Sequence, residues 1–124
     1  MRNTTAHEDV EQATLFTWAG LKSGQRPELR LLFHIPNGGS RGKAEAARFK
    51  AEGVKAGVPD LFLPVARGPY HGLFIEMKRQ KGGKVSDAQK AWIEALNTQG
   101  YFAAVCYGWK DAADLITLYL ERGV

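Results

Sequence analysis

The sequence predicts a mixed α/β domain, and three observations support this. Apolar residues recur at helical spacing over residues 8–21 and 110–121, which predicts amphipathic helices. Residues 60–65 and 73–78 are short apolar segments on either side of a turn, which predicts a β-hairpin. A capping-box pattern at residue 86 predicts the start of another helix. The predicted order of elements is α-β-α-β-β-α-β-α.

The first half of the chain contributes a helix, a strand and a second helix. Residues 8–21 have a broad apolar face, and the polar, glycine-containing segment 23–27 ends this helix. Residues 29–35 are almost continuously apolar, which predicts a buried strand closed by residues 36–39. Residues 41–52 are predicted to form a helix that ends at Gly53.

The second half begins with the hairpin, and Pro64 indicates that its first strand, residues 60–65, ends or meets a sheet edge there. Ser86 and Gln89 complete the capping box of a helix that runs to about Thr98, where a glycine follows. Residues 101–107 are predicted to form a strand and residues 110–121 a final amphipathic helix.

The length of 124 residues fits one domain spanning 1–124. A net charge of +4 is compatible with a phosphate-rich partner, but many basic proteins bind no nucleic acid. Cys106 is the only cysteine and lies among strand residues, so we expect a buried thiol in a protein of the reducing cytoplasm. The N-terminus is too polar for a signal peptide, and no apolar run reaches the ~20 residues of a membrane helix.

The chemistry is expected at Asp60, Glu76 and Lys78. Side chains alternate along a strand, so Glu76 and Lys78 project from the same face, about 7 Å apart. The hairpin brings Asp60 close to Glu76. Two converging carboxylates repel each other and need a cation, a shared proton or a positive neighbour. Hard oxygen ligands suit Mg²⁺. A Glu-x-Lys tripeptide is common, however, and on its own is usually a solvated strand face.

The chain resembles the VRR-NUC family of the PD-(D/E)XK, or restriction-endonuclease-like, nuclease superfamily. The resemblance extends over roughly residues 8–120. As a stand-alone domain of this size, the chain is similar to the phage and prophage members of the family. The resemblance rests on several segments occurring together in order, which are His34–Gly39, Glu45–Lys50, Gly53–Leu61, Glu76–Lys78 and Ser86–Gln89. The implied fold is a mixed β-sheet flanked by helices.

The resemblance implies that Asp60 and Glu76 bind Mg²⁺ or Mn²⁺ and that Lys78 is the catalytic lysine. The expected ligand set also includes the backbone carbonyl of Met77. The family has a glutamate on the first helix, and both Glu8 and Glu11 qualify. Glu8 is favoured because it stands four residues before Gln12, on one helical face. An acidic first turn would also suit the helix dipole without any catalytic role.

Gln89 matches a glutamine of the family, although its place in the capping box already explains it. Asn37, Gly38 and Gly39 would otherwise form an ordinary turn, and in this pattern they are expected near the site. His34 is expected to be structural. Basic residues on the second helix and beyond the second hairpin strand are candidates for DNA phosphate contacts or for an ordinary solvated surface, namely Arg41, Lys43, Arg48, Lys50, Lys55, Arg79, Lys81 and Lys84.

The expected function is that of a metal-dependent, structure-selective DNA endonuclease, a hydrolase that resolves four-way (Holliday) junctions as a homodimer in a bacterial or phage-infected cell. No membrane or small-molecule substrate is expected. The final helix, with Leu115, Ile116, Leu118, Tyr119 and Leu120, has more apolar residues than one core-facing stripe needs, so it is expected in the dimer interface. The alternatives are a non-catalytic branched-DNA-binding module of a larger phage replication or repair assembly, and a basic protein with no nucleic-acid role.

Overall fold

The computed structural model describes residues 4–36 and 42–124. Its sheet has four strands in the order β1-β2-β3-β4, which are β1 (Phe33–His34), β2 (Leu61–Leu63), β3 (Leu73–Lys78) and β4 (Phe102–Tyr107). The pairs β1/β2 and β2/β3 are antiparallel, whereas β3 and β4 are parallel. The mixed sheet and the hairpin between β2 and β3 confirm the predicted fold class.

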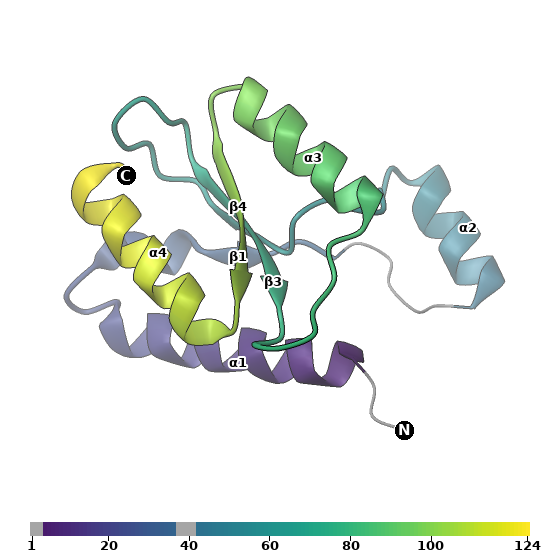
Figure 1. Cartoon of the computed structure of the whole chain (residues 1–124), viewed down its shortest axis with the longest axis horizontal. Helices are drawn as coiled ribbons and strands as arrows, with labels where there is room; N and C mark the ends of the chain where they lie inside the picture. The colour runs from purple at the N-terminus through teal and green to yellow at the C-terminus, as the bar shows by residue number, and fades with distance from the viewer. Residues whose placement is uncertain (1–3, 37–41) are drawn as a thin grey trace.

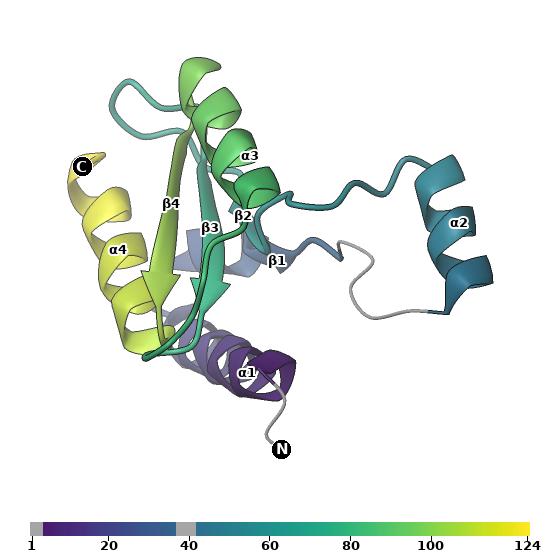
Figure 2. The ribbon, with the colours of Figure 1, turned by 45° about the vertical axis from the view of Figure 1, so that its right-hand side comes forward.

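The helices lie on both sides of this sheet (Figure 1). They are α1 (Thr4–Lys22), α2 (Lys43–Ala51), α3 (Asp87–Thr98) and α4 (Trp109–Arg122), together with the 3₁₀ helix η1 (Pro27–Leu31). The helices α1 and α4 pack against each other and against β3, and α3 packs against β4 as the crossover between the two parallel strands. Helix α2 stands apart from the other helices in Figure 2, and none of its residues is buried.

The core lies between the sheet and the pair of helices α1 and α4. Leu73, Ile75 and Met77 of β3 are each 1% exposed, as alternation along this strand predicts. They join apolar residues of α1, β2, β4 and α4, among them Cys106, the buried strand thiol that the sequence predicts. Burial raises the pKa of this thiol to about 12.

The opposite face of the sheet is covered by α3 and by a row of aromatic rings. Phe62 and Phe74 face each other across β2 and β3 and stack with 4.2 Å between ring centroids. Phe33 and Tyr101 extend the row with edge contacts of 5.8 and 6.0 Å to Phe62. Contacts of this kind between neighbouring strands stabilise a sheet. The row ends where β3 continues to Glu76.

The predicted strand over residues 29–35 is wrong in most of its length. Residues 27–31 form the 3₁₀ helix, and only Phe33 and His34 pair with β2, both exposed at the sheet edge. The buried residues here are Leu29 and Leu32, a spacing of three that matches the three residues per turn of a 3₁₀ helix. Pro27 begins this helix because its fixed φ suits a first helical turn.

The other predicted elements are present with shifted bounds. The first helix begins at Thr4 rather than residue 8, and β2 ends at Leu63, directly before Pro64 as predicted. The predicted capping box is confirmed, because Ser86 Oγ accepts from the Gln89 N–H and Gln89 Oε1 accepts from the Ser86 N–H.

Most of the apolar residues of α4 that are candidates for a dimer interface pack in the core instead. Ile116, Tyr119 and Leu120 are buried in the core, and Leu115 packs against it. Only Leu118 is largely exposed, at 39%. The apolar excess of α4 therefore belongs to the fold, so it no longer argues for a dimer surface. None of the helices within residues 4–36 and 42–124 has the length and apolarity needed to span a membrane.

Candidate active site

Strand β3 carries Glu76 and Lys78 on the face opposite the core helices. Both charged side chains are buried, with only 2% and 5% of each residue exposed. The Lys78 ammonium nitrogen lies 3.6 Å from Oε2 of Glu76. Burying a carboxylate and an ammonium group costs desolvation energy, which their pairing offsets only in part. A solvated strand face would not bury such a pair, so this contact argues against that interpretation.

Asp60 is held beside Glu76 by the start of the hairpin. Leu61 pairs with Ile75, so the antiparallel register places Asp60 next to Glu76. The carboxylate Oδ2 of Asp60 accepts a 2.7 Å hydrogen bond from the Met77 N–H. The backbone carbonyl of Asp60 accepts a 2.6 Å hydrogen bond from the Ile35 N–H and lies 3.0 Å from His34 Nδ1. His34 thus contacts the backbone of Asp60, in keeping with the structural role expected for it.

The segment that leads to Asp60 is fixed against α3. Gly57 has a φ of +92°, and a Cβ atom there would lie 2.8 Å from the backbone of Ala88. Only glycine fits both this conformation and this close approach. Pro59 is buried between Gly57 and β2. The direction in which Asp60 enters the site is therefore set by a backbone contact between a loop and a helix.

The two carboxyl groups have strongly perturbed acidity. Burial, followed by the charge of Asp60, raises the pKa of Glu76 to about 8, and the nearby Lys78 opposes this rise. Burial also raises the pKa of Asp60, which the hydrogen bond from Met77 opposes. Within the described residues, Oε1 of Glu76 is buried without a hydrogen-bond partner. Such an atom needs a proton, a water molecule or a cation.

These features fit a hard divalent cation. The donors are carboxylate oxygens, which Mg²⁺ and Mn²⁺ prefer, and one of them lacks a partner. In the described parts of the chain, no three His, Cys, Asp or Glu side chains gather closely enough to hold a metal ion alone. An ion at Asp60 and Glu76 would need further oxygen donors from backbone, water or substrate, which is usual for Mg²⁺. The backbone of Met77 runs between Glu76 and Lys78, and its N–H contacts the carboxylate of Asp60.

The two glutamates of α1 have different surroundings. Burial raises the pKa of Glu8, and the charges of Lys78 and Asp60 also act on it, so Glu8 lies within electrostatic range of the site. Glu11 is engaged elsewhere: Oε1 accepts a 2.8 Å hydrogen bond from the Trp109 N–H, and Oε2 accepts a 3.1 Å bond from Gln80 Nε2. Glu11 therefore caps the start of α4 and ties it to the chain just beyond β3. Sequence patterns do not predict this role, because Trp109 lies far from Glu11 along the chain.

Gln89 combines the two roles that the sequence left open. Its Oε1 completes the capping box with Ser86, and its Nε2 donates a 2.9 Å hydrogen bond to Glu76 Oε2. The capping box therefore fixes the side chain that orients Glu76. Helix α3 is placed relative to β3 by this bond and by the contact between Ala88 and Gly57.

The basic residues predicted to contact DNA are less closely tied to the site. Lys43, Arg48, Lys81 and Lys84 are exposed, and Arg48 lies 3.8 Å from Glu45. Arg79 is half-buried and donates to the Gly82 carbonyl at 3.1 Å, and its charge acts on Glu8. Asn37, Gly38, Gly39 and Arg41 lie outside the described residues.

Comparison with known proteins shows the family to which the chain belongs. Residues 7–110 match the VRR-NUC domain. A solved structure described as a VRR_NUC domain protein is similar to this chain with a TM-score of 0.79 and 37% sequence identity, over 92% of this chain and 88% of the other. No curated protein matches the chain. The chain therefore belongs to the VRR-NUC domain family.

Proposed function

We propose that the protein is a metal-dependent DNA endonuclease that hydrolyses phosphodiester bonds at the site formed by Asp60, Glu76 and Lys78. The VRR-NUC domain is a nuclease-type domain, which supports DNA as the substrate. The observation that carries the proposal is the buried pair Asp60 and Glu76, with a partnerless oxygen on Glu76 and an ammonium group 3.6 Å away. A binding module would gain nothing from burying carboxylates that repel phosphate.

Asp60, Glu76 and the backbone carbonyl of Met77 would hold Mg²⁺ or Mn²⁺, with Glu8 as a further carboxylate close by. When bound, such an ion supplies positive charge to the phosphate and makes water more acidic. Lys78 lies 3.6 Å from Glu76 and is positioned to stabilise negative charge that develops on the phosphate oxygens. Gln89 holds the Glu76 carboxylate in place through its 2.9 Å hydrogen bond.

The test is incubation of the protein with single-stranded, duplex, flap, splayed and four-way DNA in Mg²⁺, Mn²⁺ or EDTA. We expect cleavage with either metal and none with EDTA, and no cleavage by the Glu76→Gln variant, which excludes a contaminating nuclease. DNA binding without cleavage in any metal would overturn the proposal and favour a non-catalytic branched-DNA-binding module. Absence of both would favour a basic protein with no nucleic-acid role.

The proposed substrate is the four-way junction, and the proposed active form is a homodimer. One site cuts one strand at a time, whereas resolving a four-way junction needs two cuts related by symmetry. A two-fold dimer supplies both cuts, and such dimers are the commonest soluble oligomers. Light scattering at micromolar protein and a cruciform plasmid assay test this. A monomer that only nicks the cruciform would contradict the resolvase while leaving the nuclease proposal intact.

A further inference from the structure

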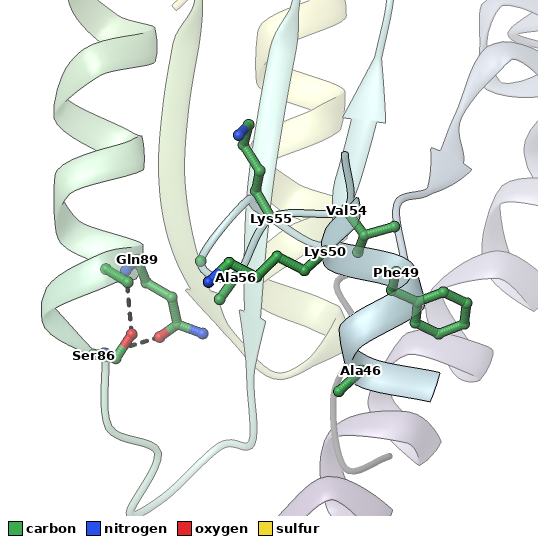
Figure 3. A pocket seen from close by; sticks show the side chains of 10 residues that line it. Ala46, Phe49, Lys50, Val54, Lys55, Ala56, Ser86 and Gln89 are labelled. Atoms are coloured by element: carbon green, nitrogen blue, oxygen red, sulfur yellow. Dashed lines mark hydrogen bonds between the residues drawn. The ribbon is translucent and has the colours of Figure 1, made fainter. Parts of the chain in front are cut away.

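A pocket of about 680 Å³ lies between the end of α2 and the start of α3. This volume is in the range of pockets that bind small organic molecules. Figure 3 shows the pocket from close by, with α2 and the segment after it on one side and α3 on the other. Its lining residues are Ala46, Phe49, Lys50, Val54, Lys55, Ala56, Gly57, Ser86, Ala88 and Gln89.

The lining of the pocket combines positive charge with apolar surface. Lys50 and Lys55 are its charged residues, and no carboxylate is among those that line it. Lys50 reaches from α2 past Ala56 toward α3 (Figure 3). In the ion pairs of the described residues neither lysine takes part. Ala46 and Val54 add an apolar wall. This combination suits a ligand with a phosphate and a less polar body, such as a nucleotide.

The pocket adjoins the candidate active site through Gln89. Gln89 lines the pocket, and its side-chain amide also donates a 2.9 Å hydrogen bond to Glu76. One side chain therefore lies between the pocket and the Glu76 carboxylate. On the other side, Gly57 lines the pocket and precedes Asp60 by three residues in the segment packed against Ala88. A DNA strand held at Asp60 and Glu76 would therefore have to extend past Gln89 to reach the pocket.

We propose that this pocket binds the nucleotide next to the cleaved phosphodiester, with Lys50 and Lys55 contacting its phosphate and the wall of Ala46 and Val54 contacting its sugar or base. This rests on the proposed nuclease function. The carboxyl groups at the site do not attract the DNA backbone by themselves. The two lysines of the pocket supply the attraction that keeps the strand in place, and they act on binding rather than on chemistry.

The experiment uses the cleavage-deficient Glu76→Gln protein and a fluorescein-labelled DNA that the wild-type protein cuts, with binding followed by anisotropy. Lys50→Ala and Lys55→Ala, each in this background, are expected to weaken binding about tenfold and to lower the slope of log K against log salt by about one. Lys110→Ala is the matched control, because it removes the same charge from α4, where the lysine side chain is 70% exposed. It is expected to leave affinity and slope unchanged.

Two further measurements separate a pocket from a general positive surface. Ala46→Trp fills the pocket without removing charge and is expected to weaken binding as much as a lysine variant. A neutral methylphosphonate at the phosphate next to the mapped cut is expected to weaken binding to the Glu76→Gln protein but not further to its Lys50→Ala/Lys55→Ala form. Circular dichroism checks that each variant is folded.

The proposal fails if the lysine variants match Lys110→Ala, or if Ala46→Trp binds DNA normally. Either result can occur in a protein that cuts DNA, so it would leave the nuclease function standing. A wild-type protein that neither binds nor cuts DNA would instead overturn the proposed function, and this inference with it.

Discussion

The side-chain amide of Gln89 on α3 donates a 2.9 Å hydrogen bond to Oε2 of Glu76 on β3, and its oxygen accepts a 2.8 Å bond from the Ser86 N–H. One side chain thus caps a helix and orients a buried carboxylate. The first function concerns the stability of the helix, and the second concerns the chemistry of the site. The two can be separated by substitution, because Ser86 takes part only in the first.

We expect Gln89→Ala to lower both stability and cleavage, whereas Ser86→Ala lowers stability alone. Ser86→Ala removes the N-cap side chain and costs about 1 kcal/mol, whereas Gln89→Ala keeps that cap and loses the reciprocal bond from the Ser86 N–H. Only Gln89→Ala removes the hydrogen bond to Glu76, so its kcat is expected to fall about tenfold while KM for DNA changes little. Thermal unfolding and steady-state cleavage rates provide the two readouts. Equal loss of kcat in both variants would mean that Gln89 acts through the helix and not through Glu76.

Asp60→Asn and Glu76→Gln are each expected to abolish cleavage and to leave DNA binding intact or tighter. Both changes preserve shape and an acceptor oxygen, including the one that receives the Met77 N–H, and remove a negative charge that repels phosphate. Cleavage assays in Mg²⁺ and anisotropy measurements test the two halves separately. A variant that cuts DNA at close to the wild-type rate would show that the site is elsewhere.

Lys78→Ala is expected to lower the cleavage rate by about 10² or more, the usual effect of one electrostatic or acid–base group. The metal ligands remain in this variant, so Mn²⁺ should still bind, which calorimetry measures. A loss of Mn²⁺ affinity equal to that of Glu76→Gln would indicate that Lys78 mainly maintains the structure of the site.

Glu8→Gln and Glu11→Gln are expected to have opposite profiles. Glu8 feels the charges of Lys78 and Asp60, so its substitution should reduce cleavage with little loss of stability. Glu11 accepts hydrogen bonds from Trp109 and Gln80, so its substitution should reduce stability more than activity. Cleavage rates measured well below the melting temperature of both variants give the ranking. The reverse order would assign the helix carboxylate to Glu11.

The metal-free protein is expected to lose stability as the pH rises from about 4.5 to about 8. The pKa of Glu76 is raised to about 8 in the folded state, so the folded protein keeps a proton that the unfolded chain releases. The stability is therefore fully present below the ordinary pKa and is lost as the pH approaches 8. Chemical denaturation in EDTA at several pH values measures this. Glu76→Gln should flatten the dependence, and an unchanged dependence would contradict the assignment to Glu76.

The elements that were predicted correctly depend on short stretches of sequence. The capping box at Ser86 and Gln89 and the alternation in β3 are local patterns, and both are present as predicted. The prediction of a strand over residues 29–35 is wrong because a short apolar run does not distinguish a strand from a 3₁₀ turn. The burial of Leu29 and Leu32 depends on the packing of η1 against α1. Local sequence patterns do not predict that contact.

Some contacts of the candidate site could not be predicted either, because they join elements that are distant in the sequence. The position of Asp60 beside Glu76 follows from the predicted hairpin. The bond from Gln89 to Glu76 depends on how α3 crosses the sheet, and the bond from Trp109 to Glu11 joins the first helix to the last. The pocket at Lys50 and Lys55 is also lined by Gly57 and Ala88, a contact between a loop and a helix that the sequence pattern does not predict.

The buried thiol of Cys106 gives this protein its own reporter of opening. Cys106 pairs in register with Met77, the residue between Glu76 and Lys78. It is 2% exposed in the core, and its pKa is raised to about 12, so thiol reagents should react with it only when the core around β4 opens. The protein has one cysteine, so the labelling rate is a single signal. That rate should slow when a ligand occupies the adjacent carboxylates, which makes the thiol an optical monitor of a site to which it does not itself belong.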